Sequence, residues 1–162
     1  MRITDTHIYF WGSFLSNWIP SDLQIHYCDH IFTNSEQIFM FLKAIFFNDP
    51  ETASNIIVAG KDPRTAKKLG GQVKNFKEEE WAKVREEKMY TAIMLKFQSS
   101  LKLRKQLLDT GDKILVEGTP MDAIWGVMIK WDDDLILDEK NWKGQNLLGK
   151  VLMRVRNDLL KN

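Results

Sequence analysis

The 162-residue sequence contains one cysteine, Cys28, and carries a net charge of only +1. A single cysteine excludes an intrachain disulfide framework and suits a reducing compartment. A net charge near zero means that no overall electric field draws the chain to nucleic acid or to a membrane. The first residues, MRITDTHIYF, lack the apolar run of a signal peptide, and no stretch approaches the length of a membrane span. We therefore expect a cytoplasmic protein with no membrane partner, of unspecified oligomeric state.

The sequence does contain ample apolar and aromatic material for a core. Hydrophobic residues make up 44% of the chain, which includes six tryptophans and nine phenylalanines. A chain of this length most simply forms one domain and buries about two-thirds of its unfolded surface. Because no repeat, low-complexity tract or linker interrupts it, we expect a single compact domain over residues 1–162.

Proline, glycine and capping residues divide the chain into segments that predict a mainly α-helical fold. After an irregular start over residues 9–22, residues 23–32 predict a short two-stranded antiparallel ribbon that turns at Cys28 and Asp29. A further strand is predicted at residues 113–117. Helices are predicted at residues 36–47, 50–60, 62–70, 77–97, 99–111 and 144–160.

Two ionisable residues interrupt the most apolar of these helices. Glu36 and Lys43 are seven residues apart and therefore lie on one stripe, roughly 10 Å apart along the axis. Apolar residues on all sides indicate a helix buried in the core. Burial lowers the pKa of a lysine, and the neutral amine is a nucleophile toward carbonyl carbon. Alternatively, Glu36 completes a capping box with Thr33, and Lys43 reaches solvent past its apolar neighbours.

Three other polar segments each have a structural interpretation beside a functional one. In HYCDH, His26, Cys28 and His30 lie on one side of a strand, as in part of a zinc site. A hairpin turn is favoured, because the sequence has no second histidine or cysteine cluster. The acidic residues 131–139 lack the spacing of a calcium loop and predict a solvated loop. The basic residues 61–77, which include a helix start, suit either phosphate binding or a solvated charged face.

The stretch TPMDAIWG is a turn in which Asp122 lies between Pro120 and Trp125. A carboxylate beside an indole suits a site where a ring is stacked and a proton is transferred. The alternative is a cap, in which Asp122 accepts hydrogen bonds from the turn and Trp125 packs inside.

Six stretches together resemble the YbiA-like, or NADAR, family. They are FLSNW, NSEQIFMFLKAIFF, DPRTAKKLG, EEEWAKVREEKMYTAIMLKF, LLDTGDKILVEGTPMDAIWG and WKGQNLLGKVLMRVR. Their order and spacing match the family over about residues 9–160. The glutamate followed by a lysine seven residues later, the T-P-x-D-x-x-W-G turn and the late N-x-L-G are specific motifs. Where relatives often have a histidine after the glutamate, this chain has Gln37.

The resemblance implies a compact, mainly α-helical hydrolase that cleaves N-glycosidic bonds without a metal or other cofactor. The expected substrate is ADP-ribose attached to guanine, in nucleotides or in DNA. Early ribosylated pyrimidine intermediates of riboflavin biosynthesis are an alternative substrate, and a non-catalytic module that binds ADP-ribose or NAD is an alternative function.

The resemblance also implies the residues of the site. We expect Glu36 to stabilise an oxocarbenium-like centre, Asp122 to protonate the leaving base or activate water, and Lys43 to attack C1. These side chains, together with Trp125, are expected to face one concave pocket. The expected substrate-binding residues are Asn17, Trp81, Trp125 and Asn146, with Arg64 and Lys67 as a basic rim for phosphates.

Overall fold

The computed structural model of the chain describes residues 1–19 and 23–161. Residues 20–22, at the end of the segment predicted to be irregular, lie outside the described residues. The chain divides into two compact units, which are treated separately below. Unit 1 comprises Met1–Ser16 and Lys102–Asn162, and unit 2 comprises Asn17–Leu101. None of the helices in the described ranges has both the length and the apolar character that crossing a membrane requires.

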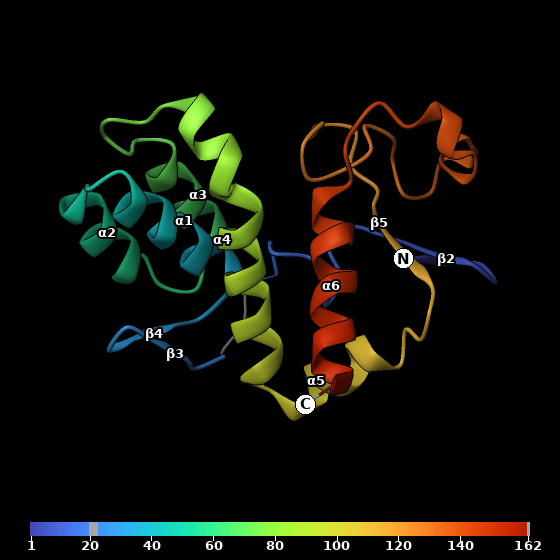
Figure 1. Ribbon diagram of the computed structural model, residues 1–162, viewed down its shortest axis with the longest axis horizontal. Helices are drawn as coiled ribbons and strands as arrows, with labels where there is room; N and C mark the ends of the chain where they lie inside the picture. Colours follow the sequence, from blue (N-terminus) through green and yellow to red (C-terminus); the bar gives the residue numbers. More distant parts are fainter. Residues whose placement is uncertain (20–22, 162) are drawn as a thin grey trace. The chain divides into compact units, whose positions relative to one another are not determined.

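Unit 2 is built around one central helix. Its elements are β3 (Ile25–Tyr27), β4 (His30–Phe32), α1 (Ser35–Phe46), α2 (Pro50–Ile57), α3 (Pro63–Gly70) and α4 (Glu78–Gln98). Helix α1 packs against α2, α3 and α4 and also contacts β4 (Figure 1). The predicted central position of this helix within its unit is therefore confirmed. Its predicted all-round burial is wrong for the last turn, where Ile45 and Phe46 are exposed.

Strands β3 and β4 form the predicted antiparallel ribbon, with Ile25 opposite Phe32. Cys28 and Asp29 occupy the turn with φ values of 48° and 60°. Two consecutive residues with positive φ are typical of the tight turn that joins twisted strands. The hairpin interpretation of HYCDH is confirmed. Within the described residues, no group of three or more histidine, cysteine or acidic side chains is arranged to hold a metal ion.

The start of α1 differs by one residue from the predicted capping box. Asn34 is the N-cap, and its side chain accepts a hydrogen bond of 2.9 Å from the backbone N–H of Gln37. The Gln37 side chain holds the residue before the cap, because its Oε1 accepts a 2.9 Å hydrogen bond from the backbone N–H of Thr33. Its Nε2 donates to two carbonyl groups at the end of α2. Asn34, and not Thr33, is therefore the N-cap, and the predicted capping position is wrong by one residue.

Unit 1 contains a three-stranded sheet in the order β1-β2-β5, in which β1 is antiparallel and β5 parallel to β2. Its elements are β1 (Arg2–Ile3), β2 (His7–Phe10), β5 (Ile114–Glu117), the 3-10 turns η1 (Asp134–Leu137) and η2 (Glu139–Asn141), α6 (Leu147–Lys161) and most of α5 (Leu101–Leu108). Strand β5 and the helices agree with the predictions. Strand β2 was missed, because its partner β5 lies more than a hundred residues away in sequence.

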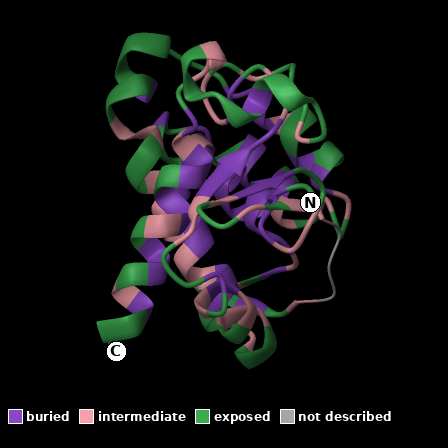
Figure 2. Cartoon of the chain, turned by 90° about the vertical axis from the view of Figure 1, so that its right-hand side faces the viewer, coloured by how far each residue is buried: buried purple, intermediate pink, exposed green. Residues whose placement is uncertain are grey.

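The core of unit 1 covers both faces of this sheet: Ile8, Phe10 and Leu115 are buried on one face, and a cluster lies on the other. Tyr9, Val116, Val127 and Ile136 are buried together there, and Figure 2 shows the central strands coloured as buried. Helix α6 packs against β5. The predicted solvated loop at residues 131–139 is right for its exposed acidic side chains, but the loop is also anchored by buried Ile136 and contains the 3-10 turn η1. Consistent with the fold class predicted from sequence, the described residues are mainly helical.

Candidate active site

Helices α1 and α3 of unit 2 pack closely where they cross, and the polar residues of the candidate site in this unit lie along that crossing. A Cβ atom on Gly70 would overlap Sδ and Cγ of Met40, so only glycine allows the observed packing at this point. On α1, Glu36, Met40 and Lys43 share one stripe, because residues three and four apart are neighbours on a helix surface. Lys67 and Gly70 form the corresponding stripe on α3. The two ionisable residues of α1 therefore lie along the crossing with α3.

Glu36 is buried, with 2% of its surface exposed. Its Oε1 lies 3.7 Å from Nζ of Lys67, whose side chain is 44% exposed. A charge pair at the edge of a protein interior interacts more strongly than one in bulk water, because the effective dielectric constant is lower. A cation from α3 thus accompanies the carboxylate on α1.

The Lys43 ammonium group has three well-defined neighbours. Its Nζ donates a 2.9 Å hydrogen bond to the backbone carbonyl of Gly70. The same atom lies 4.1 Å from the ring centroid of Phe76 and 6.0 Å from that of Trp81, within the range of cation–π attraction. The predicted escape of this side chain to open solvent is only partly realised, because Lys43 is half-buried.

Opposing influences act on the protonation of Lys43. Burial lowers the pKa of its amine, and the positive charge of Lys67 lowers it further. The carboxylates of Glu78 and Glu36 act in the opposite direction, but the net result is a pKa below the usual lysine value. The neutral amine is therefore more accessible than in an exposed lysine.

Trp81 belongs to an aromatic cluster beside Lys43. Its ring centroid lies 5.3 Å from that of Phe39, 6.1 Å from Phe46 and 6.2 Å from Phe47. Trp81 itself is buried, at 6% exposure. Much of its ring area is therefore used in packing, and its predicted contact with a substrate stays a prediction.

The other predicted residues of unit 2 have clear partners within the unit. Oδ1 of Asn17 accepts a 2.7 Å hydrogen bond from the Ser35 hydroxyl, and Nδ2 of Asn17 lies 2.9 Å from Sδ of Met89. These contacts join Asn17 to α1 and α4. Arg64 is exposed on α3, and its Nε donates to the Asp62 carboxylate that caps that helix. Contact of either residue with substrate stays a prediction.

Asp122 lies in unit 1 and caps the turn in which it occurs. Its Oδ1 accepts hydrogen bonds from the backbone N–H groups of Ile124 (2.9 Å) and Trp125 (2.8 Å). The turn is compact, because a Cβ on Gly126 would contact Thr119 and one on Gly144 would overlap the Gly126 carbonyl. The predicted cap is confirmed, whereas Trp125, which was expected to pack inside, is only partly buried. Both bonds use a single carboxylate oxygen, so capping and proton transfer remain compatible.

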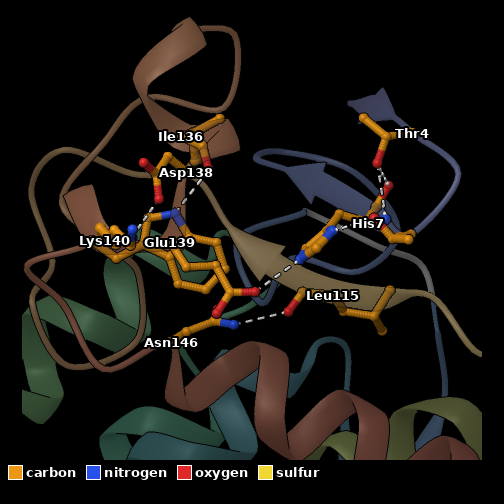
Figure 3. A network of polar contacts seen from close by, with 10 residues as sticks. Thr4, His7, Leu115, Ile136, Asp138, Glu139, Lys140 and Asn146 are labelled. Carbon is orange, nitrogen blue, oxygen red and sulfur yellow. Dashed lines mark hydrogen bonds and ion pairs between the residues drawn. The ribbon is translucent and has the colours of Figure 1, made fainter.

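Asn146, also in unit 1, joins α6 to β5. Its backbone is left-handed, with φ at 52°. Its side-chain Oδ1 accepts from the Glu117 backbone N–H at 3.0 Å. Its Nδ2 donates to the Leu115 carbonyl at 2.9 Å, as Figure 3 shows. The amide is thus bonded to the backbone of β5. Its predicted contact with sugar or phosphate stays a prediction, as does the convergence of Asp122 and Trp125 with Glu36.

Three residues near Glu36 and Lys43 were not predicted as parts of the site. In the sequence, Gly70 indicates only a helix end, where glycine is common for conformational reasons. Met40 is one of many apolar residues in α1, and Phe76 lies in a polar segment without periodicity. One feature of the sequence could have indicated that Gly70 belongs to the site. Its i, i+3 spacing from Lys67 places both residues on a common face of α3.

Comparison with known proteins identifies the fold and the family of the chain. The fold matches the NMR structure of the Escherichia coli protein YbiA, with a TM-score of 0.77 and 27% sequence identity over 99% of this chain and 88% of that chain. The protein is thus of the YbiA-like fold class. Residues 9–160 match the family model described as the NADAR domain, and the chain belongs to this family.

Relatives in other organisms carry functional names. An N-glycosidase of Acanthamoeba polyphaga mimivirus is 32% identical over 96% of this chain and 97% of its own length. A protein of Vibrio vulnificus named as a riboflavin biosynthesis protein is 28% identical over 98% of this chain, which matches 40% of that relative.

Proposed function

We propose that this protein removes ADP-ribose from guanine bases, in nucleotides or in DNA, by hydrolysing the bond between ribosyl C1 and the base nitrogen. The broader class follows from its NADAR relatives: the protein is an N-glycosidase, a hydrolase that acts on N-glycosyl bonds. The observation that carries the proposal is the pair Glu36 and Lys43, on one stripe of α1 beside the exposed basic residues of α3.

Glu36 is proposed to stabilise the transition state. Breaking a ribosyl C1–N bond develops positive charge on C1 and the ring oxygen, and a fixed carboxylate beside that charge lowers the barrier. The burial of Glu36 supports this role, because charge interactions are stronger where water is excluded.

Lys43 is proposed to act as the nucleophile. Its neutral amine attacks C1 as the C1–N bond breaks, and the base leaves with the bonding electron pair. Loss of a proton from Nζ and opening of the ribose ring convert the adduct to an imine. Water then adds to C1, the C1–Nζ bond breaks, and the free sugar and the amine are restored. The lowered pKa of Lys43 supports this role, because more of the amine is neutral near pH 7.

Asp122 is proposed to protonate the leaving base, and Trp81 and Trp125 to contact its ring. Arg64 and Lys67 are proposed to attract the diphosphate, because both are exposed on α3. Asn17 and Asn146 are proposed to contact the sugar or the phosphates.

A second candidate substrate is an early ribosylated pyrimidine intermediate of riboflavin biosynthesis. The relative from Vibrio vulnificus that carries a riboflavin biosynthesis name favours it. Such a substrate has a monophosphate and needs no diphosphate site. A non-catalytic module that binds ADP-ribose or NAD remains the third candidate, but it would not require a nucleophilic amine beside a buried carboxylate.

Product analysis on purified protein separates these candidates. Guanosine carrying ADP-ribose on its base and a phosphoribosylated aminopyrimidine are incubated separately with the wild type and with Glu36→Gln. We expect the wild type to release ADP-ribose and the unmodified guanosine, detected by mass spectrometry, and the variant to release far less. Release from the pyrimidine alone would favour the second candidate. Binding of ADP-ribose without turnover of either compound would favour the third.

A further inference from the structure

Lys67 occupies a position with two electrostatic partners. It lies on the stripe of α3 that faces α1, one turn before Gly70. Its Nζ is 3.7 Å from the buried carboxylate of Glu36, although its own side chain is 44% exposed. One turn further along the same crossing, the Gly70 carbonyl accepts the hydrogen bond from Lys43. Lys67 is thus placed to act on both ionisable residues of α1.

We propose that Lys67 is a positioning residue for Glu36 and Lys43, in addition to any contact that it makes with phosphate. In this role the ammonium of Lys67 holds the Glu36 carboxylate toward α3 and repels a proton on Lys43. The inference rests on the proposed function, since it assigns a role within the same reaction.

The direction of each effect follows from charge. A cation beside the buried carboxylate favours its ionised form, which is the form that stabilises positive charge at C1. The same cation disfavours a second ammonium nearby, and the charge of Lys67 indeed lowers the pKa of Lys43. A single side chain thereby favours an ionised acid and a neutral amine together. Without Lys67, burial would still lower the pKa of Lys43, but the carboxylates of Glu78 and Glu36 would raise it with less opposition. A smaller share of the amine would then be neutral and nucleophilic.

A phosphate-binding lysine would behave differently on substitution. Loss of a contact made equally in the ground state and the transition state raises KM and leaves kcat unchanged. Loss of a group that sets the protonation of the catalytic residues lowers kcat and moves the pH profile. The two roles are therefore separable by kinetics.

The test compares Lys67→Met, Lys67→Arg and Lys68→Met with the wild type. Lys68 is exposed on the same helix, but one residue along it points about 100° away from the stripe. For each protein, kcat and KM are measured from pH 6 to pH 10. The titration of Lys43 is measured separately in the ligand-free protein, by the pH dependence of its acetylation with a limiting amount of acetic anhydride, read by peptide mass spectrometry.

We expect Lys67→Met to lower kcat at pH 7 by about tenfold, in addition to any rise in KM that follows from the loss of a phosphate contact. The titration of Lys43 and the rising limb of the kcat profile should both move to higher pH. Lys67→Arg, which keeps the charge, should restore both, and Lys68→Met should leave the Lys43 titration in place. A raised KM with an unchanged pH profile would overturn the inference in favour of phosphate binding alone. So would an equal effect of Lys68→Met, or an unmoved Lys43 titration in Lys67→Met.

The two readouts separate failure of this inference from failure of the proposed function. If the wild type turns over neither substrate, the proposed function fails, while the acetylation of Lys43 still reports whether Lys67 governs its charge. If the wild type is active and the Lys43 titration is the same in Lys67→Met as in the wild type, the inference fails and the proposed function stands.

Discussion

The ammonium of Lys43 donates a 2.9 Å hydrogen bond to the carbonyl of Gly70, the last residue of α3. The bond joins a side chain on the central helix of unit 2 to the end of a neighbouring helix. Carbonyl groups at the end of a helix lack intrahelical partners and carry partial negative charge, so they attract a donor such as this amine. The bond orients Lys43. A full negative charge at this position would keep the amine protonated, but the carbonyl carries only a partial one.

Replacing Glu36 with glutamine tests the carboxylate. The substitution keeps size and hydrogen-bonding capacity but removes the charge that would stabilise the oxocarbenium-like centre. We expect turnover to fall by about 10²-fold or more. The melting temperature should change little, because exposed Lys67 can turn to solvent when its partner is lost. Steady-state kinetics and thermal unfolding provide the measurements. Turnover within about twofold of the wild type would remove Glu36 from the mechanism.

Trapping with borohydride tests the covalent step. Borohydride reduces an imine between Nζ of Lys43 and C1 to a stable amine, so the wild type should gain the mass of the reduced sugar during turnover. Lys43→Ala should show no such adduct and should lose most of its activity. The modified peptide is identified by mass spectrometry. Near-normal turnover by Lys43→Ala would instead indicate direct attack of water on C1, with the glycosidase assignment intact.

The pH dependence of stability tests the burial of Lys43. Its pKa is lower in the folded chain than in the unfolded chain, so between these two values the unfolded chain binds more protons. Stability therefore rises with pH across that window, below the usual lysine value of about 10.4. Lys43→Met lacks this contribution. Urea unfolding from about pH 7 to about pH 10 should show the wild type gaining stability relative to the variant as pH rises. Parallel curves would mean that the folded protein leaves this amine unperturbed.

Two substitutions of Asp122 separate its capping role from a catalytic one. Asparagine keeps an oxygen that can accept from the N–H groups of Ile124 and Trp125, whereas alanine does not. We expect Asp122→Ala to lower the free energy of unfolding by about 1 kcal/mol and Asp122→Asn to lower it much less. If Asp122 donates a proton to the leaving base, both variants lose about 10²-fold or more in turnover. If Asp122→Asn is as active as the wild type, the capping role of Asp122 stands and its catalytic role is excluded.

Gly149 tests the packing of α6 on β5. A Cβ at this position would overlap the Leu115 carbonyl oxygen and crowd the side-chain amide of Asn146. We expect Gly149→Ala to lower the free energy of unfolding by at least about 1 kcal/mol, although alanine is the better helix former. Lys150→Ala, at the next and exposed position of the same helix, is the matched control and should change stability by less than about 0.5 kcal/mol. Equal stability of the two variants would mean that the strand and helix separate at little cost.

The sequence alone was sufficient for the local structure. Asp62, Pro63 and Gly70 predicted the bounds of α3 because caps and breakers act within a few residues of the helix ends. The spacing of Glu36 and Lys43 placed them on one stripe because helical periodicity is local. The family, and with it the enzyme class, was also readable, because its motifs are short and ordered.

Only the tertiary structure decided what those residues contact. The pairing of Lys67 with Glu36, the bond from Lys43 to Gly70 and the packing of Phe76 beside Lys43 join segments separated by many residues. Strand β2 escaped prediction for the same reason, because its parallel partner β5 is remote in sequence. The capping box was misplaced by one residue, since Asn34 and Thr33 are both good caps and the contacts of Gln37 with α2 favour the former. Local propensity determines which elements form, whereas the charge of each ionisable group depends on neighbours that only folding brings close.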